Sequence, residues 1–266
     1  MTGRLTPLFE TCRAEHRAAL IGYLPAGYPT VDGSRALFGA MLESGCDLVE
    51  VGVPYSDPVL DGPTIQAAAD AALRGGVRLR DVFSVVESVA SAGGRAVVMT
   101  YWNPVHRYGV NAFARDLGAA GGLGVITPDL IPDEAQDWLA AAQAHDMDRV
   151  FLVAPSSTDQ RIADTVAATR GFLYASSVMG VTGARDAVSS AAAELVGRVR
   201  QYTQELPVGV GLGVRNGAQA AEVAAFADGV IVGSAFVTAV AQGEPGVRAL
   251  ANDLATGVRR PAPQPA

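Results

Sequence analysis

Eight short apolar runs, separated by longer Ala-rich stretches, are the feature of this sequence that most constrains its fold. The runs are continuously apolar, a pattern typical of strands buried on both faces of a parallel sheet. Eight strand–helix units over about 250 residues match an α/β fold of the (β/α)8 TIM barrel type. An open doubly wound sheet is the main alternative, and the regular spacing favours the closed barrel. The predicted strands cover residues 19–24, 48–53, 96–100, 124–127, 149–153, 172–176, 208–211 and 230–232.

The stretches between these runs have helical periodicity and readable ends. The stretch 133–145, for example, opens with acidic residues directly after Pro132, which favours the start of a helix. No linker, charge block or change of composition divides the chain. We therefore predict one barrel domain over residues 1–258, followed by a disordered Pro-rich tail over residues 259–266. The predicted helices cover residues 31–44, 64–73, 133–145, 189–204, 216–226, 234–242 and 246–256.

The charged residues exclude several classes of function. All 20 basic residues are Arg, so the chain has no amine for a Schiff base, a tethered pyridoxal phosphate or a P-loop. The 27 acidic residues give a net charge of −7, which argues against nucleic-acid binding. Three His and two Cys are scattered without the spacing of metal ligands, so we expect no metal site.

The cellular compartment is predicted from three features that the sequence lacks: a disulfide framework, a signal peptide and a membrane span. Two distant Cys do not make a disulfide framework, which fits a reducing cytoplasm. Residues 1–17 are polar and contain no apolar core of a signal peptide. No apolar run approaches the roughly 18–20 residues that span a membrane. We therefore expect a cytoplasmic protein that does not bind membranes.

Glu50 is an ionisable residue inside an apolar strand. It shares one face of the predicted strand with Leu48 and Gly52, because side chains alternate across a strand. It lies near the strand's carboxyl end, which is the catalytic face of a barrel. Buried surroundings disfavour the charged form of a carboxyl group, so Glu50 is a candidate general acid near neutral pH. The alternative is a structural Glu paired with a buried Arg.

Asp61 lies on the loop that follows this strand. Three prolines stiffen the loop, and its position over the mouth of the barrel places a second carboxylate near Glu50. Two carboxylates in different environments are a common arrangement for acid–base catalysis. The alternative for Asp61 is a turn or N-cap residue ahead of the next helix.

Glycines after the last strands indicate a phosphate site. Gly213 follows the seventh predicted strand, and Gly233 with Ser234 opens a short helix after the eighth. Backbone N–H groups at Gly and at a helix start can approach an anion closely, and this is the usual phosphate position in a barrel. The loop after the sixth strand, residues 177–185, has the composition of a hinged lid, and its Gly183 could add another N–H. The alternative in each case is an ordinary tight turn or flexible connection.

With these residues identified, the chain resembles the α subunit of tryptophan synthase over about residues 5–254. The most specific match is EVGVPYSDPVLDGPTIQ, residues 50–66, which is similar to the family pattern LE-G-P-SDP-ADGP-IQ. GVTG at 180–183, GLG at 211–213 and VGSA at 232–235 support it. Two departures are Val59-Leu60, where the family commonly has a small residue before the Asp, and Tyr23, where some members carry Phe.

The resemblance implies a lyase that splits indole-3-glycerol phosphate into indole and glyceraldehyde 3-phosphate without a cofactor. It implies a cytoplasmic α2β2 complex with a β subunit that uses the indole for tryptophan biosynthesis. Glu50 would move protons at indole C3 and at the glycerol hydroxyl, and Asp61 would accept the indole N–H. Substrate would also meet Tyr23, Met99, Ile126, Thr127, Val153, Tyr174 and Thr182. The phosphate would be held by Gly183, Gly213, Gly233 and Ser234.

Three other readings share part of this pattern. Another phosphate-handling barrel of aromatic or histidine biosynthesis would share the glycine loops but not residues 50–66. A self-sufficient lyase that releases free indole would have the same catalytic residues. A catalytically weak chain that mainly activates a β subunit would not need Glu50 and Asp61 intact.

Overall fold

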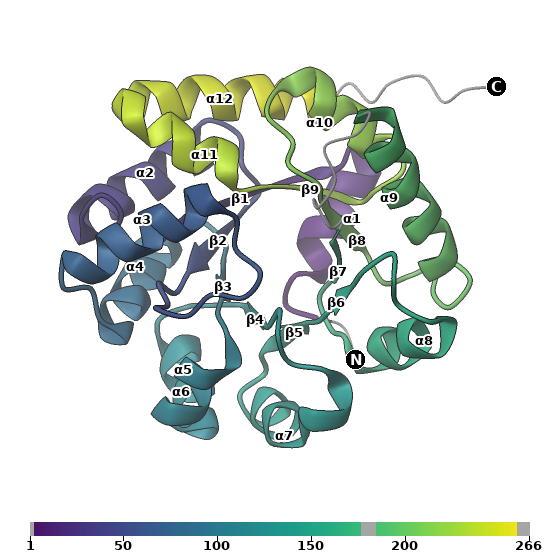
Figure 1. The fold of residues 1–266 in the computed structure, drawn as a ribbon, viewed down its shortest axis with the longest axis horizontal. Helices are drawn as coiled ribbons and strands as arrows, with labels where there is room; N and C mark the ends of the chain where they lie inside the picture. The colour runs from purple at the N-terminus through teal and green to yellow at the C-terminus, as the bar shows by residue number, and fades with distance from the viewer. Residues whose placement is uncertain (1–2, 177–184, 260–266) are drawn as a thin grey trace.

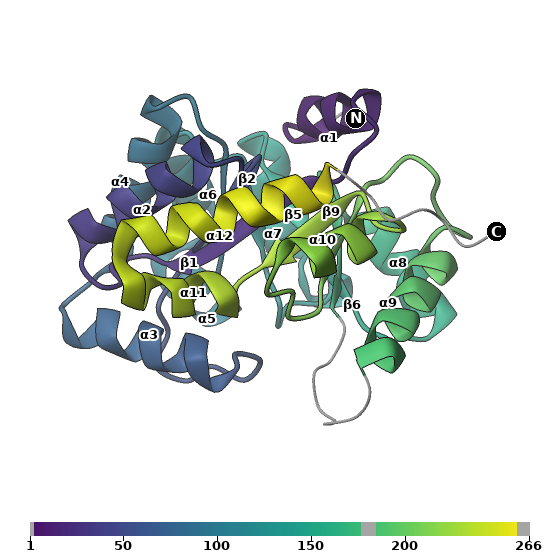
Figure 2. The ribbon, with the colours of Figure 1, turned by 90° about the horizontal axis from the view of Figure 1, so that it is seen from above.

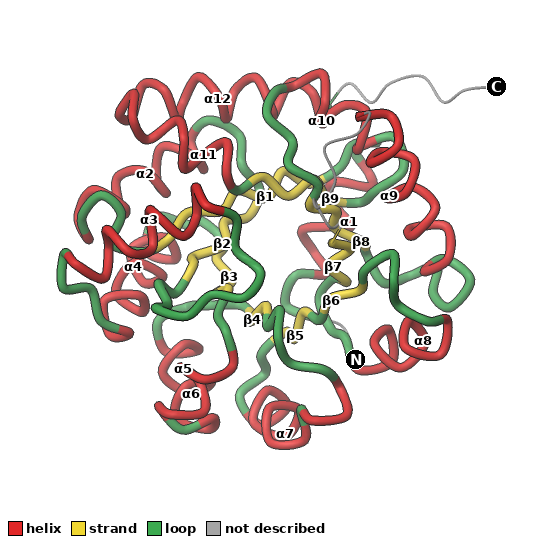
Figure 3. Tube along the Cα trace, in the orientation of Figure 1, coloured by secondary structure: helices red, strands yellow, loops and turns green. Residues whose placement is uncertain are grey.

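A computed structural model describes residues 3–176 and 185–259 of the chain. Nine parallel strands form one sheet in the order β5-β4-β3-β2-β1-β9-β8-β7-β6. The two ends of this order, β5 and β6, are consecutive segments of the chain separated only by Phe151, so the sheet closes on itself. Figure 1 shows the ring of strands viewed end-on, and Figure 3 shows the helices arranged around it. The predicted (β/α)8 barrel is confirmed, and the open doubly wound sheet is excluded.

The strands agree with the eight predicted runs apart from the fifth, which is divided into two. The backbone N–H of Tyr174 still donates to the carbonyl of Phe151 at 3.1 Å, so the interruption leaves the barrel continuous. The strands are β1 (Ala19–Pro25), β2 (Leu48–Gly52), β3 (Ala96–Met99), β4 (Gly124–Ile126), β5 (Asp148–Val150), β6 (Leu152–Val153), β7 (Leu173–Ser176), β8 (Val208–Gly211) and β9 (Gly229–Val232).

The helices include five that the sequence analysis did not predict: α1, α4, α5, α6 and α8. In α4 the buried residues Val82, Val85, Val86 and Val89 have the spacing of one helical face, so this helix was readable from the sequence. The predicted helix 133–145 divides into the short turn η1 and α7, and the predicted helix 189–204 begins earlier and ends at Val199.

The helices around the first half of the barrel are α1 (Thr6–Ala14), α2 (Val31–Glu43), α3 (Pro63–Arg74), α4 (Leu79–Ser91), α5 (Trp102–Tyr108) and α6 (Val110–Ala119). Those around the second half are η1 (Pro132–Glu134), α7 (Gln136–Ala144), α8 (Asp159–Ala168), α9 (Arg185–Val199), α10 (Gly217–Ala224), α11 (Ser234–Ala239), η2 (Val240–Gln242) and α12 (Gly243–Val258). None of the described helices is long and apolar enough to cross a membrane.

Two apolar cores follow from the alternation of side chains along the strands. The larger core lies between the strands and the helices, and the smaller one fills the barrel interior. Leu5, Leu8, Phe9 and Cys12 from α1 and the segment before it join the interior core. Helix α1 therefore closes one end of the barrel, and Figure 2 shows it on the side away from α3. Because α1 packs at the amino ends of the strands, the carboxyl ends are left for the loops that carry the candidate site.

Candidate active site

Glu50 lies in the middle of β2 and faces the interior of the barrel. Its neighbour on the same face, Leu48, belongs to the interior core, and Glu50 pairs in register with Tyr23 of β1 and Val97 of β3. The side chain is 1% exposed, and its Oε1 atom has no hydrogen-bond partner in the described part of the chain. Burial raises the pKa of the Glu50 carboxyl to about 8.

The cause of this shift decides between the two readings of Glu50. Burial is its only cause, so no described cation holds the carboxylate. The alternative of a Glu paired with a buried Arg is therefore wrong for the described residues. A carboxyl group that keeps its proton to about pH 8 can donate that proton near neutrality.

Asp61 lies in the loop between β2 and α3, at the carboxyl end of the barrel. The N-cap of α3 is Gly62, so the alternative of Asp61 as an N-cap is wrong. Its carboxyl group adjoins the hydroxyl of Tyr101, and its backbone carbonyl accepts from Gln66 Nε2 at 2.7 Å. Burial raises the pKa of Asp61, and the Tyr101 hydroxyl opposes this by favouring the ionised form. The two carboxyl groups thus have different environments, as acid–base partners require.

Two buried tyrosines belong to the same region as these carboxyl groups. The pKa values of Tyr23 in β1 and Tyr174 in β7 are raised well above their ordinary range, first by burial and then by the charges of Asp61 and Glu50. Both tyrosines therefore lie near both carboxyl groups, although they come from distant parts of the sequence. The structure brings together four of the predicted site residues at one end of the barrel.

Two glycines make room for these phenol rings. A Cβ atom on Gly52 would lie 2.5 Å from the Tyr23 hydroxyl oxygen, and one on Gly211 would lie 2.5 Å from that of Tyr174. Both distances are shorter than real Cβ atoms allow. The absence of a side chain at these two strand ends therefore allows the rings their present positions.

The apolar lining predicted for the substrate is partly corrected. Met99 and Ile126 pack with the interior core, as expected for residues that face the barrel axis. Val153 belongs instead to the core between the strands and the helices, and its neighbour Leu152 packs with the interior. The prediction was off by one residue, and a one-residue slip along a strand turns the side chain to the other face. Thr127 is buried at the end of β4, and its hydroxyl has no partner among the described residues.

The predicted phosphate residues lie after β8 and β9. Gly213 has a φ of +76°, a conformation that side chains rarely adopt. Gly233 is the N-cap of α11, and Ser234 is the first residue of that helix. A Cβ atom on Gly233 would lie 3.4 Å from the Tyr23 ring, so the start of α11 adjoins the site. Thr182 and Gly183 lie outside the described residues.

Tyr101 and Leu152 are the residues that sequence reasoning missed. Tyr101 lies two residues after the end of β3, at the carboxyl end of the barrel, and it is 5% exposed. An aromatic residue with a polar group at such a strand end was a usable signal. Leu152 follows from simple alternation along the fifth run, since Val150 faces the interior.

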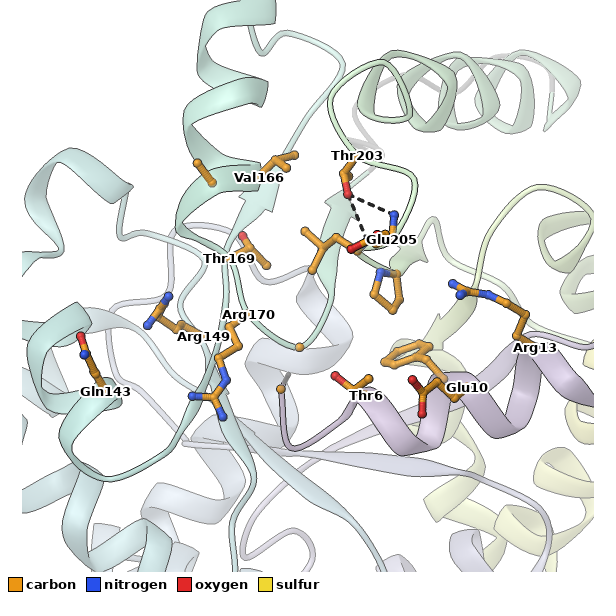
Figure 4. A pocket seen from close by; sticks show the side chains of 16 residues that line it. Thr6, Glu10, Arg13, Gln143, Arg149, Val166, Thr169, Arg170, Thr203 and Glu205 are labelled. Atoms are coloured by element: carbon orange, nitrogen blue, oxygen red, sulfur yellow. Dashed lines mark hydrogen bonds between the residues drawn. The ribbon is translucent and has the colours of Figure 1, made fainter. Parts of the chain in front are cut away.

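A cavity lies at the opposite end of the barrel from these residues. A cavity of about 690 Å³ lies between α1 and the loops around Arg170 and Glu205. Figure 4 shows Glu10 and Arg13 on α1, with Arg149 and Arg170 on the other side of the cavity. None of the predicted site residues lines this cavity, and its position beside α1 assigns it to the amino end. Among the described residues no group of three or more His, Cys, Asp or Glu is arranged to hold a metal ion, and the absence of a metal cofactor stays a prediction.

The fold and the site define a (β/α)8 barrel enzyme with two carboxyl groups at its carboxyl end. The family model described as tryptophan synthase alpha chain matches residues 9–260. The tryptophan synthase alpha chain of Mycobacterium tuberculosis is 69% identical over 256 residues, which cover 96% of this chain and 94% of the relative. That of Nocardia farcinica is 69% identical and covers 96% of both chains. The solved structure of Mycobacterium tuberculosis tryptophan synthase is 67% identical and matches with a TM-score of 0.93, covering 97% of this chain and 99% of that chain. This chain belongs to the tryptophan synthase alpha chain family, as its resemblance predicted.

Proposed function

We propose that this chain is the α subunit of a tryptophan synthase, a lyase that splits indole-3-glycerol phosphate into indole and glyceraldehyde 3-phosphate. The observation that carries the proposal is the pair of carboxyl groups at one end of the barrel. Glu50 is buried without a described hydrogen bond to Oε1, and Asp61 is held by a phenol hydroxyl. Family membership supports the same reaction.

Glu50 performs the proton transfers. In its protonated form it donates a proton to indole C3, which converts the ring to a cationic indolenine. The bond between C3 and the glycerol carbon then breaks, and its electrons return to the indole ring. The carboxylate of Glu50 accepts the proton of the adjacent glycerol hydroxyl as the aldehyde forms, so the residue ends the cycle protonated. The pKa of about 8 supports this role, because the acid form is available at neutral pH.

Asp61 stabilises the charge that develops on the ring. Its carboxylate accepts a hydrogen bond from the indole N–H and becomes more strongly bound as the ring gains positive charge. An aldol cleavage of this kind needs an electron sink, and the protonated indole ring serves as its own. A sequence without lysine is therefore compatible with the reaction.

The remaining predicted residues bind the substrate. Tyr23, Met99, Ile126 and Tyr174 enclose the indole ring, with Leu152 in the place first assigned to Val153. Thr127 and Thr182 offer hydroxyl groups to the substrate. Gly213, Gly233 and Ser234, together with Gly183, hold the phosphate through backbone N–H groups.

The partner and the location follow from the same assignment. The indole passes to a β subunit in an α2β2 complex, and the chain works in the cytoplasm. Both cysteines are buried and unpaired, which agrees with a reducing compartment. The same assignment supports a single barrel domain over residues 1–258, because α12 ends at Val258, which is fully buried. The proposed Pro-rich tail falls on residues that lie largely outside the described ones.

The test is indole release from indole-3-glycerol phosphate by the purified chain, with and without a tryptophan synthase β subunit. We expect weak release by the chain alone and strong activation by the partner. High activity that the partner leaves unchanged would identify a self-sufficient lyase. Cleavage that is absent under both conditions would refute the assigned reaction.

A further inference from the structure

We infer that Tyr101 is a positioning residue for the reaction, whose hydroxyl fixes both the Asp61 carboxylate and the loop that carries it. This inference rests on the proposed function, because it assigns a task to Asp61 in that reaction. Tyr101 itself lies between β3 and α5, at the N-cap of α5, and is anchored by the barrel rather than by the loop.

The hydroxyl of Tyr101 interacts with two consecutive residues of the loop. It accepts a hydrogen bond from the backbone N–H of Leu60 at 3.0 Å, and it adjoins the carboxyl group of Asp61, whose pKa it lowers. A phenol has one proton to give, and the Leu60 N–H already occupies an acceptor position. The proton is therefore free to point to Asp61, and a phenol proton directed at a carboxyl group favours its ionised form, which is the stronger acceptor.

The hydrogen bond from Leu60 to Tyr101 holds a part of the loop that is otherwise exposed. The side chains of Val59 and Leu60 are 75% and 60% exposed, so burial does not hold them. The ring of Tyr101 also rests against Tyr55, with 5.3 Å between the ring centroids, and the Tyr55 hydroxyl accepts from Asn103 Nδ2 at 3.1 Å. The start of the loop is thus held through Tyr55, and its catalytic end is held through the Tyr101 hydroxyl.

The groups that face Asp61 show what the hydroxyl does to its ionisation. Tyr23 comes from β1, Glu50 from β2 and Tyr174 from β7, and each is neutral or anionic at neutral pH. No described cation lowers the pKa of Asp61, and the Tyr101 hydroxyl is the group that does so against the effect of burial. Removing the hydroxyl should therefore raise the pKa of Asp61 and leave the Leu60 N–H without its partner.

The experiment compares Tyr101→Phe with the wild-type chain and with Tyr108→Phe, using kcat and KM for indole-3-glycerol phosphate across the pH range. Tyr108→Phe is the matched control, because the Tyr108 hydroxyl also donates to a carboxylate, Asp116 at 2.6 Å, on the exposed surface. We expect kcat/KM of Tyr101→Phe to fall roughly tenfold to hundredfold, as for the loss of a hydrogen bond to a charged group. We also expect the acidic limb of its pH profile to move to higher pH, while Tyr108→Phe follows the wild type.

The outcomes separate this inference from the proposed function. If Tyr101→Phe cleaves the substrate with an acidic limb at the wild-type position, Tyr101 does not set the ionisation of Asp61 and the inference is overturned, whatever happens to KM. If the wild-type chain releases no indole even with the β subunit, the proposed function itself fails. Thermal unfolding of each variant shows whether a lower rate reflects less folded protein.

Discussion

Among the described residues, each end of the barrel has one almost fully buried carboxyl group, and the two groups have opposite surroundings. At the amino end, Asp148 is 0% exposed, accepts from the backbone N–H groups of Arg4 and Leu5 at 3.0 and 2.8 Å, and forms an ion pair with Arg170 at 3.0 Å. At the carboxyl end, Glu50 is 1% exposed, and its Oε1 atom has no partner among the described residues. Both carboxyl groups are shielded from water, but of the two only Asp148 has described hydrogen-bond donors and a cation beside it.

The difference separates a structural carboxylate from a reactive one. Burial raises the pKa of Asp148, and the N–H groups of Arg4 and Leu5 together with Arg170 limit this rise. The same contacts bind the segment before α1 to the barrel. For Glu50 no described group opposes the effect of burial, and the pKa rises to about 8. A buried charge without partners costs free energy, so Glu50 keeps its proton until a reaction takes it.

The largest effect expected from this comparison is on activity. Glu50→Gln keeps the size of the side chain but removes its exchangeable proton, so indole release should fall by about hundredfold or more. The measurement is kcat/KM with the β subunit present, and Glu87→Gln, an exposed substitution of the same kind on α4, should retain wild-type activity. A loss smaller than tenfold for Glu50→Gln would contradict the assigned role.

The same substitution should stabilise the protein at alkaline pH. Between its ordinary pKa of 4.5 and about 8, Glu50 holds more protons in the folded than in the unfolded chain, so the free energy of unfolding falls as pH rises through this window. Gln has no proton to lose. Glu50→Gln should therefore exceed the wild type in stability at pH 9, by up to about 5 kcal/mol, and match it near pH 4. Denaturant unfolding at both pH values measures this, and a parallel pH dependence of the two proteins would show that Glu50 titrates normally.

Neutralising the carboxylate at the other end should act in the opposite direction. Asp148→Asn weakens two hydrogen bonds from backbone N–H groups and leaves Arg170 with less countercharge, so the free energy of unfolding at pH 7 should fall by about 3 kcal/mol. Activity per folded molecule should remain, because Asp148 lies at the end of the barrel away from the site. If Asp148→Asn were as stable as the wild type or more stable, the proposed difference between a structural carboxylate at the amino end and a reactive one at the carboxyl end would be wrong.

The sequence predicted the barrel and its chemistry at different levels of detail. Strand positions were readable because a parallel sheet buries continuous apolar runs, and Glu50 was recognisable as an acid inside such a run. The loop tyrosine Tyr101 was not predicted, because its contact with Asp61 joins residues 40 positions apart and depends on how two loops fold over the barrel mouth. Val153 was chosen over Leu152 because the fifth run has no polar residue that marks its inner face.

A smaller effect should sharpen the description of the carboxyl end. A methyl group on Gly211 meets the hydroxyl of Tyr174, so Gly211→Ala must displace that ring from the neighbourhood of Glu50 and Asp61. We expect roughly a tenfold loss of kcat/KM, since small misplacements in an active site are costly to catalysis. Gly197→Ala on α9 is the control, because a Cβ atom there meets nothing within 4 Å. Restoration of activity by Tyr174→Phe in the Gly211→Ala chain would show that the phenol oxygen is the clashing atom, and an unchanged Gly211→Ala enzyme would show that the ring position does not matter.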